Sequence, residues 1–357
     1  MKLLLLGLSQ GLYKHDSTKQ LAFIIIRIWL GVKLLLQKLN HFLEKAMPFI
    51  TPTGVVVGVL LASYLASYIF LVPWIFAFIT FSGSLGSNFS SLKRIASNPL
   101  PIIVVLCILH VVMPIWAWLL GHLVFPGDNL TITGLVLGVV IPTGVTSLLW
   151  VSIYKGNSLL TLTIVLIDTL LSPIIVPYSV AFFSGTSVEM DTMAIMKGLI
   201  GMVVIPSLIG MVLNQITKGK IKPMLGPRLA PFSKIALGIC VTLNSAKVAP
   251  YLSHIDAKLI KMAIMVFFIA FSGYLLSWMV GKFLKWEKEE IITVTYTGGM
   301  RNIAAGAALA VAYFPAAVAV PVILGTLFQQ ILASVYGSFL NRYYHKPKPV
   351  QENKMAA

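Results

Sequence analysis

Three ionisable side chains lie inside long apolar runs of the sequence, where charged groups are rare. Asp168 is the acidic member, Arg301 is the basic member, and His110 is a third, weaker candidate. A charged side chain at the centre of a membrane helix costs about 2.5–3.5 kcal/mol on insertion scales, and in such segments it marks a binding or coupling site. A buried Arg301–Asp168 ion pair that only fixes helix packing is the structural alternative.

Asp168 shares a predicted helical face with two hydroxyl groups. Thr161, Val165, Asp168 and Ser172 stand at i, i+4, i+7 and i+11, so an α-helix would present all four on one side. A buried carboxyl beside an arginine is either a proton site or a permanent counter-ion. The sequence leaves both roles open for Asp168, with His110 as a possible partner.

Two helix-breaking clusters stand at corresponding places in the chain, Ile141-Pro142-Thr143-Gly144 and Thr297-Gly298-Gly299-Met300. Paired interruptions of this kind are typical of a transporter's central site, although glycine and proline are also common in ordinary membrane helices. The half-helices that follow the breaks would aim positive dipole ends into them, next to an arginine, which favours an anion. The residues predicted to bind substrate are Gly144, Ser147, Gly298, Gly299, Arg301 and Asn302.

The composition shows what kind of chain must position these residues. The 357 residues are 58% hydrophobic and 11% charged, whereas soluble domains carry about 25% charged residues. The net charge of +16 would suggest nucleic acid in a soluble protein, but here the basic residues occupy short loops between apolar runs. Cys107 and Cys240 lie within such runs and are predicted core residues, not a disulfide or metal pair. We predict a polytopic membrane protein that binds no nucleic acid.

Ten apolar segments are long enough to cross a bilayer. Every even-numbered segment is followed by lysine or arginine, as at Lys93-Arg94 and Lys155, which predicts a multi-pass protein of the cell membrane with both termini cytoplasmic. Residues 1–45 are predicted to be a cytoplasmic or interfacial extension with an amphipathic helix, an extra span being the alternative. The predicted spans are 47–66, 68–87, 100–122, 131–154, 158–183, 194–215, 231–251, 257–284, 289–313 and 315–341.

Ten spans divide into two halves of five. Because five is odd, a repeat of the first half in the second must be inverted in the membrane. We therefore predict an all-α fold with a transmembrane domain over 46–343, made of inverted repeats at about 46–184 and 193–343, followed by a cytoplasmic tail at 344–357. The broken segments would be the fourth and the ninth.

Several motifs together resemble the bile acid:sodium symporter family, from about Ala46 to Tyr343. The fourth segment reads Pro142-Thr143-Gly144-Val145-Thr146-Ser147-Leu148 against the family's Pro-Gly-Gly-x-x-Ser-Asn, and Lys155-Gly156-Asn157 and Ser172-Pro173 follow it. The ninth reads Thr297-Gly298-Gly299-Met300-Arg301-Asn302 against Glu-Val-Gly-Met-Gln-Asn. The resemblance implies a core domain, a panel domain, and broken fourth and ninth helices that cross beside a substrate cavity.

The departures from the family pattern concern sodium. The family binds two sodium ions behind the crossing, and on this resemblance a glutamate is replaced by Thr297, a glutamine by Arg301, and an asparagine by Leu148. An arginine where cations are held would repel sodium and supply part of its charge. We expect no cofactor and no working sodium site. The residual sodium-site positions are Ser147, Thr161, Thr297 and Met300.

We predict a secondary active transporter that moves a small organic anion across the bilayer by alternating access. Coupling would be to protons, through Asp168 and His110, or absent. A non-transporting membrane sensor or scaffold derived from the same fold is the alternative. An intramembrane aspartyl enzyme would need two paired carboxylates, and only Asp168 lies in a span, so we predict no enzyme. The sequence leaves the oligomeric state open and is compatible with a monomer.

Overall fold

The computed structural model describes residues 17–87, 99–185, 188 and 190–344. Every regular element within these ranges is a helix. Seven helical stretches in these ranges are long and apolar enough to cross a membrane, or eight if a bent N-terminal pair counts as one. The predicted all-α membrane class is thus confirmed. The basic loop with Lys93 and Arg94 and the predicted tail beyond Tyr344 lie outside the described ranges.

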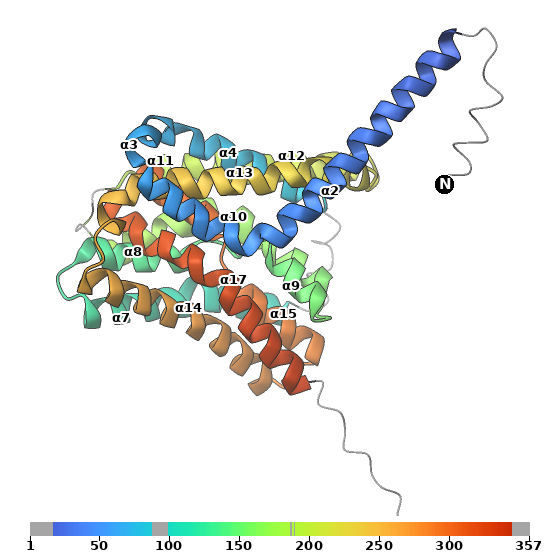
Figure 1. The fold of residues 1–357 in the computed structure, drawn as a ribbon. Helices are drawn as coiled ribbons and strands as arrows, with labels where there is room; N and C mark the ends of the chain where they lie inside the picture. The colour runs from blue at the N-terminus through green and yellow to red at the C-terminus, as the bar shows by residue number, and fades with distance from the viewer. Residues whose placement is uncertain (1–16, 88–98, 186–187, 189, 345–357) are drawn as a thin grey trace, which may run out of the picture.

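The N-terminal helix α2 (Ser17–Leu60) joins the predicted interfacial extension to the first predicted span. It bends by 79° between its parts Leu34–Glu44 and Phe49–Leu60, close to the predicted boundary at residue 45. Its N-terminal part projects away from the other helices (Figure 1). The two predicted segments are therefore continuous in one bent helix.

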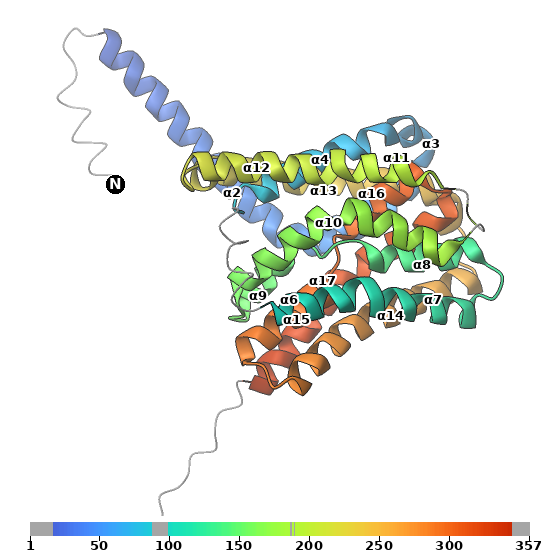
Figure 2. The same ribbon diagram turned by 180° about the vertical axis from the view of Figure 1, so that it is seen from behind.

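One layer of helices lies beside α2 and includes α13 (Figures 1 and 2). Helix α13 packs along both α2 and α4. At the crossing with α2, a Cβ atom on Gly58 would lie 2.2 Å from the carbonyl oxygen of Thr242, so only glycine permits this approach. The layer comprises α2, α3 (Ala62–Leu65), η1 (Ala66–Leu71), α4 (Val72–Ser84), α11 (Thr192–Leu199), η4 (Ile200–Val204), α12 (Ile205–Ile216) and α13 (Ile221–Leu252).

Three predicted span boundaries in this layer differ from the ends of the helices. The first span ends at Leu60 instead of residue 66, and the second apolar stretch begins at Ala62 instead of residue 68. Helix α13 begins at Ile221, ten residues before the predicted start, because basic residues and prolines lower the hydropathy of its first turns without preventing helix formation. Hydropathy marks the apolar part of a helix, not its end.

The helices of the second layer pack against the two broken helices. This layer contains two uninterrupted helices that pack on each other, α14 and α17. His110 lies in a π-helical turn, η3, that immediately precedes Met113-Pro114. The second layer comprises α6 (Leu100–Cys107), η3 (Ile108–Val112), α7 (Met113–Val124), α10 (Ser158–Ser184), α14 (Ala257–Phe283) and α17 (Ala316–Tyr344).

Both predicted breaks are present. Helix α8 (Asn129–Val140) ends before α9 (Ser147–Ile153), and α15 (Lys288–Gly299) ends before α16 (Ile303–Tyr313). The second break lies at residues 300–302, slightly later than predicted, because Gly298 and Gly299 still belong to α15. The side chain of Asn302 accepts a hydrogen bond from the backbone N–H of Ala305, so that it caps α16 and fixes where the helix resumes.

The start of α8 carries a charged cap. One carboxylate oxygen of Asp128 accepts hydrogen bonds from the hydroxyl of Thr131 at 2.6 Å and from Lys258 Nζ at 2.7 Å, and the other accepts from Thr131 N–H at 3.2 Å. Partial burial raises the pKa of the Asp128 carboxyl, but these donors together lower it by more than burial raises it. The pKa therefore lies below its ordinary value. The cap thereby ties the start of α8 to the start of α14.

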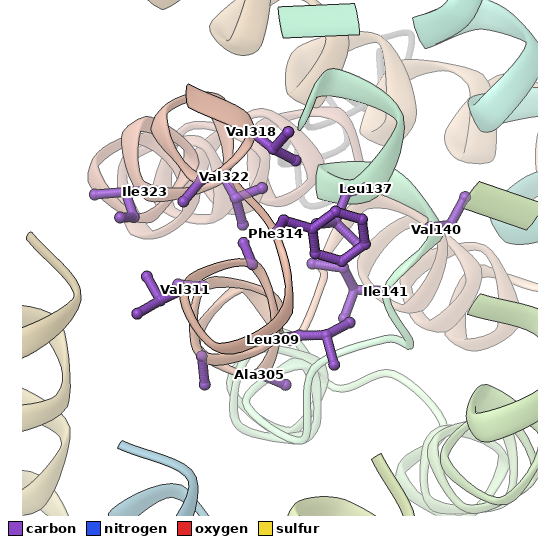
Figure 3. Close-up of a cluster of buried hydrophobic side chains, with 14 of the residues drawn as sticks. Leu137, Val140, Ile141, Ala305, Leu309, Val311, Phe314, Val318, Val322 and Ile323 are labelled. Atoms are coloured by element: carbon purple, nitrogen blue, oxygen red, sulfur yellow. The ribbon is translucent and has the colours of Figure 1, made fainter. Parts of the chain in front are cut away.

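Side chains of α8, α16 and α17 form a dense apolar core around the breaks. Figure 3 shows Leu137, Leu309, Phe314 and Val318 gathered between these helices. A Cβ atom on Gly134 would lie 2.4 Å from the carbonyl oxygen of Val318, so α8 and α17 touch backbone to backbone. This packing holds the ends of the half-helices in fixed positions.

Candidate functional site

The two breaks cross in direct contact. The backbone N–H of Asn302 donates to the carbonyl of Pro142 at 2.8 Å, and the hydroxyl of Thr143 donates to the carbonyl of Thr297 at 2.7 Å. A Cβ atom on Gly144 would lie only 2.9 Å from the carbonyl oxygen of Arg301. Because the two backbones approach this closely, the first break requires a residue without a Cβ atom at position 144.

Arg301 lies behind the crossing and satisfies carbonyl groups from both broken helices. Its Nε donates to the carbonyl of Val139 at 2.7 Å, and its Nη1 donates to the carbonyls of Gly298 at 2.8 Å and Met300 at 3.2 Å. The last carbonyls of a helix have no intrahelical partner and carry the negative end of its dipole. The side chain is 5% exposed. One guanidinium therefore neutralises the C-terminal ends of α8 and α15 together.

Asp168 lies on the other side of the first break. Its Oδ1 is 2.6 Å from Nε2 of His110, and its Oδ2 accepts a hydrogen bond of 2.6 Å from the backbone N–H of Thr143. Both partners are buried, and Nδ1 of His110 has no hydrogen-bond partner among the described residues. The carboxylate thus links α10, the π-helical turn and the crossing.

Arg301 and Asp168 form no direct ion pair in the described part of the chain, since the guanidinium donates to carbonyls and the carboxylate accepts from Thr143 and His110. They interact electrostatically across the crossing. Thr161, Val165 and Ser172, predicted to share the face of Asp168, are all buried with it. This shared face of α10 therefore points into the protein interior.

A large cavity of about 1610 Å³ lies beside the crossing of the two breaks. Its walls come from α2, α4 and α13 in one layer and from α9, α16 and α17 in the other. Of the residues predicted to bind substrate, Gly144, Arg301 and Asn302 line it, whereas Ser147 and Gly298 are buried and do not. Gly299 instead lines a small cavity of about 50 Å³ that Arg301 also touches.

The chain is similar in sequence to known membrane proteins. Residues 73–255 match the model of the sodium bile acid symporter family, and the chain is 54% identical over 301 residues to the uncharacterized protein YbaS of Bacillus subtilis (strain 168), covering 84% of this chain and 98% of that protein. The chain belongs to the sodium bile acid symporter family. The match includes the first break, α10 and α13.

Two more distant relatives of this symporter-family chain carry functional names. One is the uncharacterized sodium-dependent transporter YocS of Bacillus subtilis (strain 168), 22% identical over 324 residues, with 87% of this chain and 96% of the relative covered. Another is the probable chloroplastic sodium/metabolite cotransporter BASS1 of Arabidopsis thaliana, 24% identical over 245 residues, with 68% and 59% covered. The chain is accordingly a multi-pass membrane transporter for a small molecule.

The polar groups at three of the residual sodium-site positions of this family member have hydrogen-bond partners within the protein. The hydroxyls of Thr161 and Thr297 donate to carbonyls of their own helices, at 3.0 and 2.8 Å. The backbone carbonyl of Met300 accepts from Arg301. Only the buried hydroxyl of Ser147 has no partner among the described residues. The guanidinium of Arg301 thus lies beside these positions and donates to the carbonyl ends of both broken helices.

Three contributors to the site of this symporter-family chain escaped sequence reasoning. Thr143 was read only as part of a break, yet its N–H and its hydroxyl both bind across the crossing. Gln329 accepts a hydrogen bond of 3.4 Å from the backbone N–H of Arg301. Lys234 lines the large cavity. Only Lys234 carried a usable signal, since it is a lysine inside the predicted span 231–251.

Proposed function

We propose that this chain is a sodium-independent secondary transporter of small organic anions that works by alternating access. The observation that carries the proposal is the Arg301 guanidinium, which donates to the carbonyls of Val139, Gly298 and Met300 at the two half-helix ends. It is a covalently attached cation in the region where the family resemblance implies mobile ones.

The charge balance behind the crossing supports this view. A sodium ion in such a place is held by hard oxygens, but here the carbonyl oxygens already accept hydrogen bonds from a positive group that cannot be deprotonated in proteins. A second cation beside Arg301 would be repelled, with only Asp168 as a nearby countercharge. The two half-helices are therefore held together without sodium.

The anion would bind in the large cavity beside the crossing. Gly144 and Asn302 line this cavity at the point where α9 and α16 begin. Helix α16 directs its free N–H groups and its positive dipole end toward the break, which favours an acidic group. We assign Gly144 and Asn302 to substrate binding, and we assign Arg301 to the charge that keeps their backbone in place.

Coupling would use protons at the His110–Asp168 pair. An ionised carboxylate is only an acceptor, so with Asp168 ionised the hydrogen in the 2.6 Å contact belongs to Nε2 of His110. A further proton would go to Nδ1 of the same ring. The other oxygen of Asp168 accepts from Thr143 N–H in the crossing, so a change of protonation would act directly on the break. Arg301 is the charged group facing the pair from the second break.

The proposed architecture counts each broken helix as one span. Ten spans would then form two inverted five-helix repeats at about 46–184 and 193–343, with both termini on the cytoplasmic side of the cell membrane. The layer with α2, α4, α12 and α13 would be the panel that moves against the other layer. Residues 1–45 would be the interfacial extension and residues 344–357 the cytoplasmic tail.

A binding screen and an uptake measurement together test the proposal. Purified protein is heated with a panel of organic acids and, separately, with their uncharged amides; we expect acids to raise Tm and amides to have little effect. The stabilising acid is then offered to proteoliposomes with sodium and proton gradients imposed separately. Uptake without sodium is the expected result. No stabilising acid, or strict dependence on a sodium gradient, would overturn the proposal, and binding without flux would favour a sensor.

A further inference from the structure

An organic anion in the large cavity needs a cationic partner, and the wall offers few. The charged side chains that line it, among the residues described, are Glu44, Lys234, Arg301 and Arg342. Nε and Nη1 of Arg301 already donate to backbone carbonyls of the two broken helices. Arg342 is exposed near the end of α17. Lys234 is the cation built into the wall, with 19% of its side chain exposed.

Lys234 is held by groups from a different helix. Its Nζ lies 2.9 Å from Oε1 of Glu44 and also donates to Oδ1 of Asn40, both on α2. The Nδ2 of Asn40 donates to the same Glu44 oxygen at 2.9 Å. The two ends of the ion pair differ in environment, because the Glu44 side chain is 53% exposed. The ammonium is thus fixed in the wall, whereas the carboxylate is free to return to water.

We propose that Lys234 anchors the acidic group of the substrate and that Glu44 is an internal carboxylate which the substrate displaces. This inference rests on the proposed function and extends it to a specificity-determining residue. An ion pair with an exposed partner contributes only about 0.2–1 kcal/mol, so exchanging Glu44 for another carboxylate or a sulfonate costs little. A substrate without a negative charge would leave the Lys234–Glu44 pair intact and gain nothing at this wall.

The position of Lys234 gives this contact a second consequence. Helix α13 belongs to the layer with α2 and α4, and the crossing faces the cavity from the other layer, with α9 and α16. An acid with its charged group on Lys234 and a second acidic or hydrogen-bond-accepting group at the start of α16, beside Gly144 and Asn302, would touch both layers. The substrate is therefore an acid long enough to join Lys234 to the crossing.

The test compares each acid with its own amide in five proteins. The probes are 1-naphthoate and 1-naphthamide, followed by longer arylalkyl carboxylates and their amides, and Kd is measured by calorimetry in detergent. The proteins are wild type, Lys234→Gln, Lys234→Arg, Glu44→Gln and, as a matched control, Lys247→Gln. Lys247 is an exposed lysine of the same helix and does not line the cavity.

The expected results are specific for each variant. Lys234→Gln weakens acid binding roughly tenfold and leaves amide binding unchanged, and Lys234→Arg keeps the preference for the acid. Glu44→Gln tightens acid binding roughly two- to fivefold, because the internal competitor is gone. An acid preference that survives in folded Lys234→Gln overturns this inference and leaves the proposed function standing. No acid preference in wild type overturns both.

Discussion

Replacing Arg301 by glutamine should uncover the carbonyl groups at the ends of α8 and α15. The guanidinium donates to three carbonyl oxygens, those of Val139, Gly298 and Met300, and each buried carbonyl left without a donor costs about 1–3 kcal/mol. Asp168 would also lose the nearby positive charge with which it interacts across the crossing. Because water and the new amide satisfy some of these groups, we expect a net loss of about 3–5 kcal/mol in unfolding free energy.

The assay is thermal unfolding of purified protein, followed by tryptophan fluorescence in detergent. At about 2–4 °C for each kcal/mol, Arg301→Gln should lower Tm by roughly 6–20 °C. Arg342→Gln removes an exposed arginine from α17 and should change stability by no more than about 0.5 kcal/mol. An Arg301→Gln protein that is folded and as stable as Arg342→Gln would refute the assigned role of the guanidinium.

The same substitution gives a sodium test. Arg301→Gln combined with Thr297→Glu introduces the residue types that the family resemblance gives at these two positions. A ligand that binds only the folded protein adds about 2.7 kcal/mol when its concentration is one hundred times Kd. We expect sodium, compared with choline, to raise Tm in the double variant and to leave the wild type unchanged. Sodium stabilisation of the wild type would contradict the reasoning.

Three further results are expected. Gly134→Ala should destabilise the protein by about 1–3 kcal/mol in thermal unfolding, because the new Cβ would lie 2.4 Å from the Val318 carbonyl, whereas Gly138→Ala on the same helix meets nothing within 4 Å and should not. Asp128→Ala should lower stability by about 1 kcal/mol at neutral pH. The folded pKa of Asp128 is lowered, so the stability that the carboxylate contributes is present above about pH 3.9 and is lost as the pH falls through the folded pKa. The difference in Tm between wild type and Asp128→Ala should therefore shrink at that acidic pH. A Tm difference that does not change with pH would exclude this role. His110→Gln should abolish the response of anion uptake to a proton gradient while substrate binding persists, and an unchanged response would exclude the histidine as a proton carrier.

The elements around the site were largely predictable from sequence. Apolar length and the Pro142 and Gly299 clusters located both breaks, because helix-breaking residues act locally and their effect can be read from a short window. The ends of helices were less predictable. Helix α13 begins at Ile221, ten residues before the predicted start, because hydropathy records the apolar part of a helix and not its basic, proline-containing first turns.

The contacts of Arg301 were not predictable to the same degree. Its charge and its position after a break indicated a countercharge, but its hydrogen-bond partners are backbone carbonyls, which every residue possesses. The sequence therefore suggested Asp168 as a possible direct partner, whereas the carboxylate contacts His110 and Thr143. Side-chain partners can be inferred from complementary residue types, but backbone partners depend on where two helices end in space.

Lys234 illustrates a third limit. It lies within a predicted span, so the rule that singled out Arg301 applied to it equally. Its partner Glu44 belongs to the segment before the first span, and only the packing of α13 along α2 brings the two together. Both Lys234 and Glu44 line the cavity because of how the two layers are arranged. The sequence pattern within either helix does not contain this information.

Equilibrium binding of radioactive sodium to the purified wild-type protein tests the central claim most directly, because it requires no knowledge of the substrate. Scintillation proximity would be measured over increasing sodium concentration, with the Thr297→Glu, Arg301→Gln double variant as the comparison. With Arg301 donating to the carbonyls of Val139 and Gly298, we predict no saturable sodium binding to the wild type. Saturable sodium binding to the wild type would contradict the claim that Arg301 takes the place of the ion.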